Sequence, residues 1–234
     1  MIEIKNVTKK YGDNTALKDV SFNVNDGEIF AFIGHNGAGK TTLIKAIMGI
    51  HEFDGGDILI NGKSIKKNPV ACKKEMAYVP DNPELYENMK AINFINFICD
   101  MYEIDLETRE KNIQKYAKMF EIENNLNDTI NSFSHGMKQK IALIAALAHD
   151  PKILIMDEPF VGLDPKAVFD VKEVMNEMVK EGKTIFFSTH ILDVAEKLCS
   201  KVAIIKKGEL VKTGSMEEIK GDKSLEKVFL ELEK

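Results

Sequence analysis

The order of apolar and polar positions along the chain predicts two kinds of strand. Continuous apolar runs rich in β-branched and aromatic residues are typical of strands buried on both faces, as in parallel sheets covered by helices. Such runs lie at 29–33, 76–79, 153–156, 184–187 and 202–205. Alternating runs are typical of antiparallel strands with one face in solvent, and they lie at 2–7, 20–24 and 57–60. We therefore expect an α/β fold with a mainly parallel sheet and an added N-terminal antiparallel β layer.

The pattern becomes helical between about residues 84 and 145. Apolar positions there recur at three- and four-residue spacing, and no strand pattern accompanies them. The clearest series is Phe94, Phe97, Ile98, Met101 and Tyr102. This spacing predicts a helical subdomain, 84–145, inserted into a core formed by residues 1–83 and 146–214.

A last helix is predicted at the end of the chain. After Gly214, the pair Ser215 and Glu218 has the spacing of a capping box, in which two side chains satisfy the first backbone N–H groups of a helix. An apolar stripe follows at helical spacing, at Leu225, Val228, Phe229 and Leu232. We therefore expect a C-terminal amphipathic helix over 215–234.

Composition excludes several classes of protein. The 234 residues carry 32 Lys and Arg against 37 Asp and Glu, a net charge of −5, which gives no general attraction to a nucleic-acid backbone. The longest apolar run, 141–148, is far shorter than the ~20 residues that span a bilayer. The three cysteines form no CxxC pair, so neither a zinc site nor a disulfide framework is predicted.

Residues 34–42 read GHNGAGKTT and connect a predicted buried strand to a predicted helix at 41–48. This strand, glycine-rich loop and helix is the context in which a loop binds phosphate through its backbone N–H groups and the helix dipole. Lys40 is expected to reach the β- and γ-phosphates, and the Thr41 hydroxyl to ligate Mg²⁺. The other predicted nucleotide contacts are Gly34, Asn36, Gly37, Ala38, Gly39 and Thr42.

A second motif, ILIMDEP at 153–159, ends a buried strand with two carboxylates. Ligands of open α/β sheets bind at the carboxyl ends of the strands, so both side chains are expected at the phosphate site. Asp157 is expected to hold Mg²⁺, directly or through water, and Glu158 to accept a proton from the attacking water. A solvated turn is the alternative for an isolated Asp-Glu pair.

Together these residues resemble the ATP-binding subunit of an ABC transporter, over essentially the whole chain. FSHGMKQK at 133–140 is similar to the signature motif of that family, VGLDP at 161–165 to its D-loop, and STH at 188–190 to its switch histidine. Tyr11 lies where the family stacks an aromatic ring on adenine, and YVPD at 78–81 where its Q-loop lies. The resemblance is specific because these motifs all occur in one chain and in the family's order.

The resemblance implies an α/β P-loop NTPase core and an ATPase that uses ATP and Mg²⁺. Two subunits would pair head to tail, each ATP lying between the phosphate loop of one chain and the signature of the other. The resemblance assigns Ser134, Gly136 and Asp164 to nucleotide binding, His190 to catalysis and Asp81 to the metal. It also implies a separate membrane-spanning permease as partner, no nucleic acid, and a cytoplasmic location on the inner face of the cell membrane.

Four positions depart from the family pattern. His135 replaces the first glycine of the signature, Met137 stands where glutamine is common, and Phe160 replaces a small hydroxyl residue. These variants resemble subunits that power export of drugs, lipids or antibiotic peptides. Asp81 replaces the Q-loop glutamine, so an amide that donates and accepts becomes a carboxylate that only accepts. Its alternative role is to stabilise the turn before Pro83.

Two other functions are weighed against transport. A soluble ABC-type ATPase acting on nucleic acid or ribosomes typically carries a long coiled-coil insert or a second cassette. Here Ser134 lies only 92 positions after Thr42 (134 − 42), and the segment between them has no sustained heptads. A GTP-binding switch would be expected to contain DxxG and NKxD, and neither string occurs. The transporter subunit remains the favoured prediction.

Overall fold

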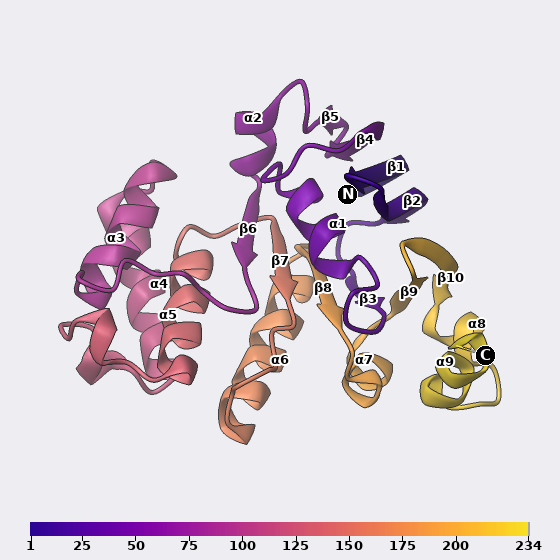
Figure 1. The fold of residues 1–234 in the computed structure, drawn as a ribbon. Coiled ribbons are helices and arrows are strands. Elements are labelled where there is room, and N and C mark those ends of the chain that lie inside the picture. The colour runs from indigo at the N-terminus through magenta and orange to yellow at the C-terminus, as the bar shows by residue number, and fades with distance from the viewer. Residues whose placement is uncertain (234) are drawn as a thin grey trace.

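The computed structural model describes residues 1–233, which form two sheets with helices packed around them (Figure 1). The smaller sheet is antiparallel, and β1 lies at its centre, paired with β2 and β4. Its strand order is β2-β1-β4-β5, with β1 at Ile2–Tyr11, β2 at Asn14–Val24, β4 at Gly55–Ile60 and β5 at Lys63–Ser64. The three alternating stretches of the sequence all lie in this sheet, as predicted.

The larger sheet has six strands, five of them parallel. Every residue of β3 and β8 is buried, in agreement with their continuous apolar runs. The order is β10-β9-β3-β8-β7-β6, with β3 at Ile29–Ile33, β6 at Met76–Val79, β7 at Ile153–Asp157, β8 at Thr184–Thr189, β9 at Lys201–Lys206 and β10 at Glu209–Ser215. The sequence patterns identified all of these except the antiparallel edge strand β10.

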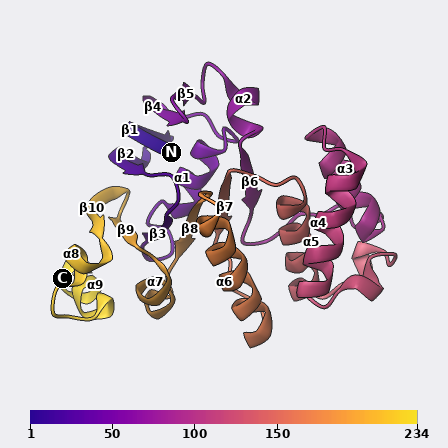
Figure 2. The same cartoon turned by 180° about the vertical axis from the view of Figure 1, so that it is seen from behind.

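Different elements pack against the two faces of the larger sheet. One face shares a core with α1 (Lys40–Ile47) and the antiparallel sheet, through side chains such as Phe32 and Leu43. The other face packs against α6 (Pro165–Lys180), which stands in front of the sheet when the molecule is viewed from behind (Figure 2). α2 (Pro69–Lys73) lies near β5 and β6, and α7 (Leu192–Leu198) precedes β9.

Three helices form a group at one side of the molecule, beyond β6 (Figure 1). They are α3 (Ala91–Met101), α4 (Leu106–Met119) and α5 (His135–Ala148), with short 3₁₀ turns η1 (Glu123–Asn125) and η2 (Ile130–Ser132) between α4 and α5. Between residues 84 and 145, where the sequence predicted helices, the secondary-structure elements are α-helices and 3₁₀ turns. α5 continues beyond residue 145 to Ala148 because its apolar run, 141–148, is buried without interruption. The predicted subdomain boundaries remain predictions.

The end of the chain forms two helices where the sequence analysis expected one. α8 (Met216–Lys220) begins with the predicted capping box of Ser215 and Glu218. It ends at Gly221, whose φ of +52° breaks the helical path, and α9 (Leu225–Glu233) begins after this turn. Lys234, the last residue of the predicted helix, lies outside the described residues. Within 1–233, no helix combines the length and apolar character that crossing a bilayer requires.

Candidate active site

The phosphate loop joins the carboxyl end of β3 to the first turn of α1. Two of its glycines cannot carry a side chain, because a Cβ on Gly34 would lie 2.6 Å from the Ile205 carbonyl oxygen and one on Gly39 would lie 2.7 Å from that of Ala16. Gly39 also has a φ of +112°, which L-residues rarely adopt. The loop is thereby fixed against β9 and β2, while the exposed residues Asn36 and Gly37 form its tip.

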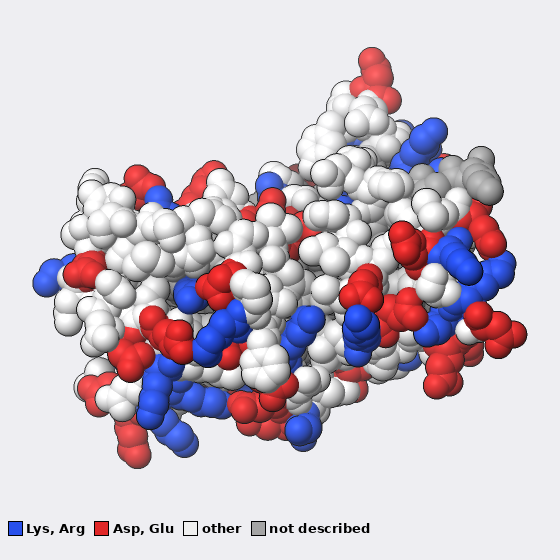
Figure 3. Space-filling view, turned by 90° about the horizontal axis from the view of Figure 1, so that it is seen from below, with Lys and Arg blue, Asp and Glu red and all other residues white. Residues whose placement is uncertain are grey.

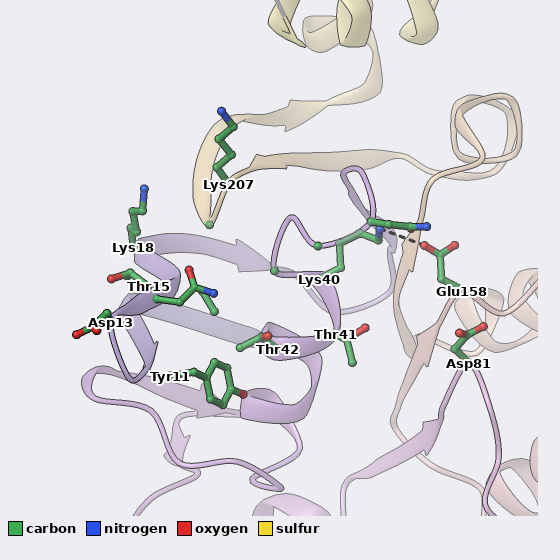
Figure 4. A pocket seen from close by; sticks show the side chains of 16 residues that line it. Tyr11, Asp13, Thr15, Lys18, Lys40, Thr41, Thr42, Asp81, Glu158 and Lys207 are labelled. Carbon is green, nitrogen blue, oxygen red and sulfur yellow. Dashed lines mark ion pairs between the residues drawn. The ribbon is translucent and has the colours of Figure 1, made fainter.

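Lys40 lies folded back into this loop and is almost fully buried. Its Nζ donates to the carbonyl oxygens of Gly34, at 2.7 Å, and His35, at 3.2 Å. The same Nζ forms an ion pair with Oε1 of Glu158 at 3.2 Å (Figure 4). The cation predicted to bind phosphate is therefore neutralised by the carboxylate predicted to be the general base.

Glu158 follows the last residue of β7 and contacts the switch histidine. Its φ of +48° lies in the left-handed region, which is strained for a non-glycine residue. The backbone N–H of Glu158 donates to the carbonyl oxygen and hydroxyl of Ser188, each at 3.2 Å. On the other carboxylate oxygen, Oε2, the Nδ1 of His190 lies at 2.9 Å and its backbone N–H at 3.3 Å. These contacts orient Glu158 toward the loop.

Asp157 and Asp81 bring two further carboxylates near Glu158. Asp157 is buried and accepts a hydrogen bond from the Ser188 hydroxyl. Desolvation, followed by the negative charges of Asp157 and Glu158, raises the pKa of Asp81 above its ordinary value. The three acidic side chains thus gather negative charge near the end of the cavity that holds the phosphate loop, and the Lys40 ammonium offsets that of Glu158.

This negative zone is suited to a magnesium ion. In the described part of the chain no three His, Cys, Asp or Glu side chains are arranged to hold a metal by themselves. Mg²⁺ usually takes one or two carboxylates and fills its other positions with substrate phosphates and water. Asp157, Asp81 and the exposed Thr41 hydroxyl fit that donor set, so these residues are compatible with the ion.

A cavity of about 920 Å³ runs from this acidic end to Tyr11. In Figure 4, Lys40, Glu158 and Asp81 lie at one end and Tyr11 at the other, so a phosphate chain and a flat ring would fit at opposite ends. Of the predicted residues, the cavity is lined by Tyr11, Asn36, Gly37, Gly39, Lys40, Thr41, Thr42, Asp81 and Glu158. Gly34 and Ala38 shape the loop from behind and do not line the cavity.

Seven lining residues were not predicted from the sequence: Asp13, Asn14, Thr15, Ala16, Lys18, Lys207 and Gly208. Asp13, Thr15 and Lys18 come from the β1–β2 hairpin, and Lys207 comes from the β9–β10 turn (Figure 4). No phosphate-binding motif includes these positions. The sequence shows only that two charged residues, Asp13 and Lys207, lie next to glycines in tight turns, Gly12 and Gly208. Lys18 and Lys207 add positive charge to the cavity wall, and Lys18 lies on the side of Tyr11 and Asp13 (Figure 4).

Ser134, Gly136 and Asp164 lie together but away from this cavity. Ser134 caps α5 by accepting from the Met137 N–H at 3.3 Å, and Asp164 caps α6 by accepting from the Ala167 N–H at 2.9 Å. The two segments touch, because a Cβ on Gly136 would lie 3.2 Å from the Gly162 carbonyl oxygen. None of the three lines the cavity that contains Lys40.

Two departures from the expected motif have defined surroundings. The His135 ring lies against Gly162, where an added Cβ would come within 2.6 Å of its Cδ2. Phe160 is buried and packs edge-on against Phe187 of β8, with ring centroids 5.7 Å apart. Phe160 is therefore a core residue in this structure, and His135 fills the space beside the D-loop glycine.

Comparison with known proteins identifies the family. The family model described as "ABC transporter" matches residues 17–161. The ABC-type transporter ATP-binding protein EcsA of Bacillus subtilis (strain 168) is 36% identical over 239 residues, covering 100% of this chain and 97% of EcsA. The chain belongs to the ABC transporter family, as an ATP-binding subunit.

Solved structures of ABC ATP-binding subunits share the whole fold. One, described as an ATP binding subunit of an ABC transporter, has a TM-score of 0.96 at 35% identity and covers 100% of both chains. The ATP-binding cassette MJ0796, a dimer in a post-hydrolysis state bound to ADP and Pi, has a TM-score of 0.84 at 26% identity, covering 92% of this chain and 99% of that one. The predicted family and ABC ATPase fold are confirmed, and ATP binding and hydrolysis follow from membership.

Proposed function

We propose that this ABC subunit hydrolyses ATP in a head-to-tail dimer and powers a separate membrane-spanning permease. One observation carries the proposal. The cavity contains the phosphate loop and Glu158 but not the exposed Ser134 or the half-buried Gly136, which lie in a separate cluster. A chain that holds two complementary half-sites apart is suited to completing each ATP site with a second chain.

The contacts of Lys40 support an order of events. The triphosphate would compete with Glu158 for the ammonium group, and its greater charge would draw Nζ toward the phosphates. Glu158 would then accept a proton from the water that attacks the γ-phosphorus, and ADP would leave as the bridging bond breaks. His190 would hold Oε2 of Glu158 in place. Bound Mg²⁺, held by Asp157, Asp81 and Thr41, would neutralise phosphate charge.

The helix N-terminus capped by Ser134 suits the other half of the site. Backbone N–H groups and the dipole of α5 favour a negative group there, and the small side chains of Ser134 and Gly136 leave room for a phosphate. We propose that this end of α5 contacts the γ-phosphate bound by the partner chain, with Asp164 beside it. The site would then close only when both chains and ATP are present.

An apolar groove is proposed as the place where the permease docks. It lies between the segment that leaves β6 and the helices α3 and α5, with a volume of about 240 Å³. Phe94 and Tyr102 line it, and exposed aromatic and apolar side chains, Tyr86 and Met101, lie nearby on the same subdomain. The position of Asp81 at the start of this segment would link nucleotide to permease.

We propose export as the direction of transport and the cytoplasmic face of the cell membrane as the location. The departures at His135, Met137 and Phe160 support export, and dependence on a permease supports the location. A nucleic-acid partner is not proposed, because the net charge is −5 and lysines are interspersed with acidic residues over the face shown in Figure 3.

The decisive variant is Glu158→Gln, which keeps the shape of the side chain but removes the proton acceptor. It should bind ATP and Mg²⁺, lose hydrolysis and accumulate as a dimer, measured by light scattering with and without ATP. Glu173→Gln, an exposed glutamate on α6, is the matched control and should remain active. Wild-type hydrolysis by Glu158→Gln would remove the proposed base, and an inactive, ATP-saturated monomer would contradict the two-chain site.

The transport role is tested by co-expression with a neighbouring gene product that has several ~20-residue apolar spans. The two should purify as a complex in detergent, and ATPase activity should change when the complex is placed in vesicles. A nuclease or ribosomal neighbourhood, with no such gene product, would favour the alternative of a soluble ABC-type ATPase.

A further inference from the structure

The last helix of the chain contacts the phosphate loop from outside the nucleotide cavity. The imidazole of His35 lies edge-on to the phenyl ring of Phe229 in α9, with 4.9 Å between ring centroids and 65° between ring planes. His35 is part of the loop but does not line the nucleotide cavity, whereas the next two residues, Asn36 and Gly37, do. Phe229 lies 194 positions after His35 in the sequence (229 − 35), yet its ring contacts the loop that would hold the triphosphate.

The Phe229 ring is held by the core and not by the loop. Phe229 is 6% exposed and belongs to the larger of the two cores, together with Leu225 and Val228 of the same helix. Near the start of α9, the Leu225 N–H donates to Oε2 of Glu196 at 2.8 Å. Toward its end, the Lys206 Nζ donates to the Leu232 carbonyl oxygen at 2.9 Å. The helix is thus anchored along its length and presents a fixed aromatic surface.

The backbone of His35 is connected to the predicted phosphate ligand. Its carbonyl oxygen accepts from the Ala38 N–H at 3.1 Å and from the Lys40 Nζ at 3.2 Å. A hollow of about 220 Å³ lies beside the loop, lined by residues 35–38 with Lys206 and Lys207, so this side of the loop is not solidly packed. A ring contact in such surroundings restricts the rotation of His35 and of the carbonyl that it carries.

We propose that Phe229 is a positioning residue for ATP binding: through the His35 ring, it keeps the phosphate loop in the form that receives the triphosphate. The inference rests on the proposed binding of ATP at this loop. Phe229 touches neither the cavity nor Lys40, so its effect on nucleotide must pass through His35. Loss of the contact should weaken binding more than it slows the chemical step.

The test is a double-mutant cycle on the full chain, with ATP affinity measured by competition against a fluorescent nucleotide. Phe229→Ala and His35→Ala should each weaken ATP binding roughly three- to tenfold, the range expected for one edge-to-face ring pair. The double variant should be no weaker than His35→Ala alone, because the two act through one contact. His35→Phe, which restores a ring edge, should bind ATP within about twofold of wild type.

A matched control variant, and a comparison of the effects on KM and kcat, distinguish a positioning role of Phe229 from a general loss of structure. Leu230→Ala alters an exposed residue of the same helix and should leave the ATP dissociation constant unchanged. In steady state, Phe229→Ala should raise KM while kcat at saturating ATP stays within about twofold of wild type. Circular dichroism at the assay temperature verifies folding, and if Phe229→Ala is unfolded, Phe229→Leu carries the same prediction.

Two results would overturn the inference. The first is a folded Phe229 variant that binds ATP with wild-type affinity. The second is a double variant whose loss of ATP affinity equals the product of the losses in Phe229→Ala and His35→Ala. Failure of ATP binding at this loop looks different, since nucleotide affinity would then respond to neither Lys40→Ala nor the two ring variants.

Discussion

The ammonium group of Lys40 and the carboxylate of Glu158 form a buried ion pair at 3.2 Å. Each residue is predicted to act on a different part of the reaction, one on phosphate and the other on water. Because they are paired, the two groups must separate before Lys40 can contact phosphate and before Glu158 can accept a proton from water. The same contact keeps a lysine and a glutamate from being buried with unpaired charge, which would be costly.

Lys40→Ala and His190→Ala should separate binding from turnover. Removing Lys40 takes away positive charge that compensates the phosphates in the ground state, so ATP affinity should fall. Removing His190 loses the 2.9 Å contact that orients Glu158, so kcat should fall while the dissociation constant changes little. Calorimetry gives the first quantity and a steady-state assay gives the second. Equal ATP dissociation constants for Lys40→Ala and wild type would rule out the role given to Lys40.

Asp81→Asn should weaken the Mg²⁺ dependence of ATPase activity and leave metal-free ATP binding nearly unchanged. The carboxylate is the proposed magnesium ligand. Desolvation, followed by the negative charges of Asp157 and Glu158, raises its pKa, so a cation would relieve repulsion that an amide would not experience. Titrating Mg²⁺ at fixed ATP on both proteins measures the effect. Asp13→Asn, at the Tyr11 end of the same cavity, is the matched control. Superimposable Mg²⁺ titration curves would contradict the metal role and leave Asp81 with its alternative role of stabilising the turn before Pro83.

His149 should make the fold sensitive to mild acid. Burial lowers its pKa from 6.5 to about 4, and its ring stacks on Tyr102 at a centroid distance of 3.7 Å. The unfolded chain therefore binds a proton between pH 6.5 and 4 that the folded chain does not, so stability present above pH 6.5 is lost as the pH falls toward 4. The loss should reach about 3 kcal/mol, an order-of-magnitude figure from 1.36 kcal/mol per pKa unit.

Urea unfolding of wild type and His149→Phe at pH 7 and pH 4.5 tests this. Phenylalanine keeps a ring for Tyr102 but does not titrate, so the variant should lose less unfolding free energy between the two pH values. All other titrating groups are common to both proteins, and the difference isolates His149. Parallel losses would show that His149 is not the acid-sensitive group.

The sequence was most informative where a residue's surroundings are close in the chain or fully buried. The apolar runs of β3 and β7 allow few alternatives, and the loop from Gly34 to Lys40 carries its own geometry. β10 escaped prediction because its residues are mostly half-buried or exposed, so no apolar run marks an edge strand. The turn at Gly221 was overlooked because the stripe beyond it has the same helical spacing.

Contacts between distant segments could not be predicted from local pattern. Lys18 reaches the cavity from strand β2 and Lys207 from the β9–β10 turn of the other sheet. The Phe229 ring reaches His35 only because α9 packs against α7 and α8. The pairing of Lys40 with Glu158 likewise depends on β3 and β7 being separated only by β8. Such information lies in the topology of the sheet and appears in the sequence only through the family resemblance.

The backbone at Glu158 has a consequence for how this protein can be altered. A left-handed φ of +48° is easy for glycine, tolerable for asparagine and unfavourable for glutamate. Replacing Glu158 by glycine or asparagine would relieve that strain, but it would leave the buried ammonium group of Lys40 without its ion-pair partner, which is costly. A search for heat-resistant variants would therefore gain little at position 158 unless position 40 changed with it. Such a double change would remove both the predicted phosphate contact and the predicted proton acceptor.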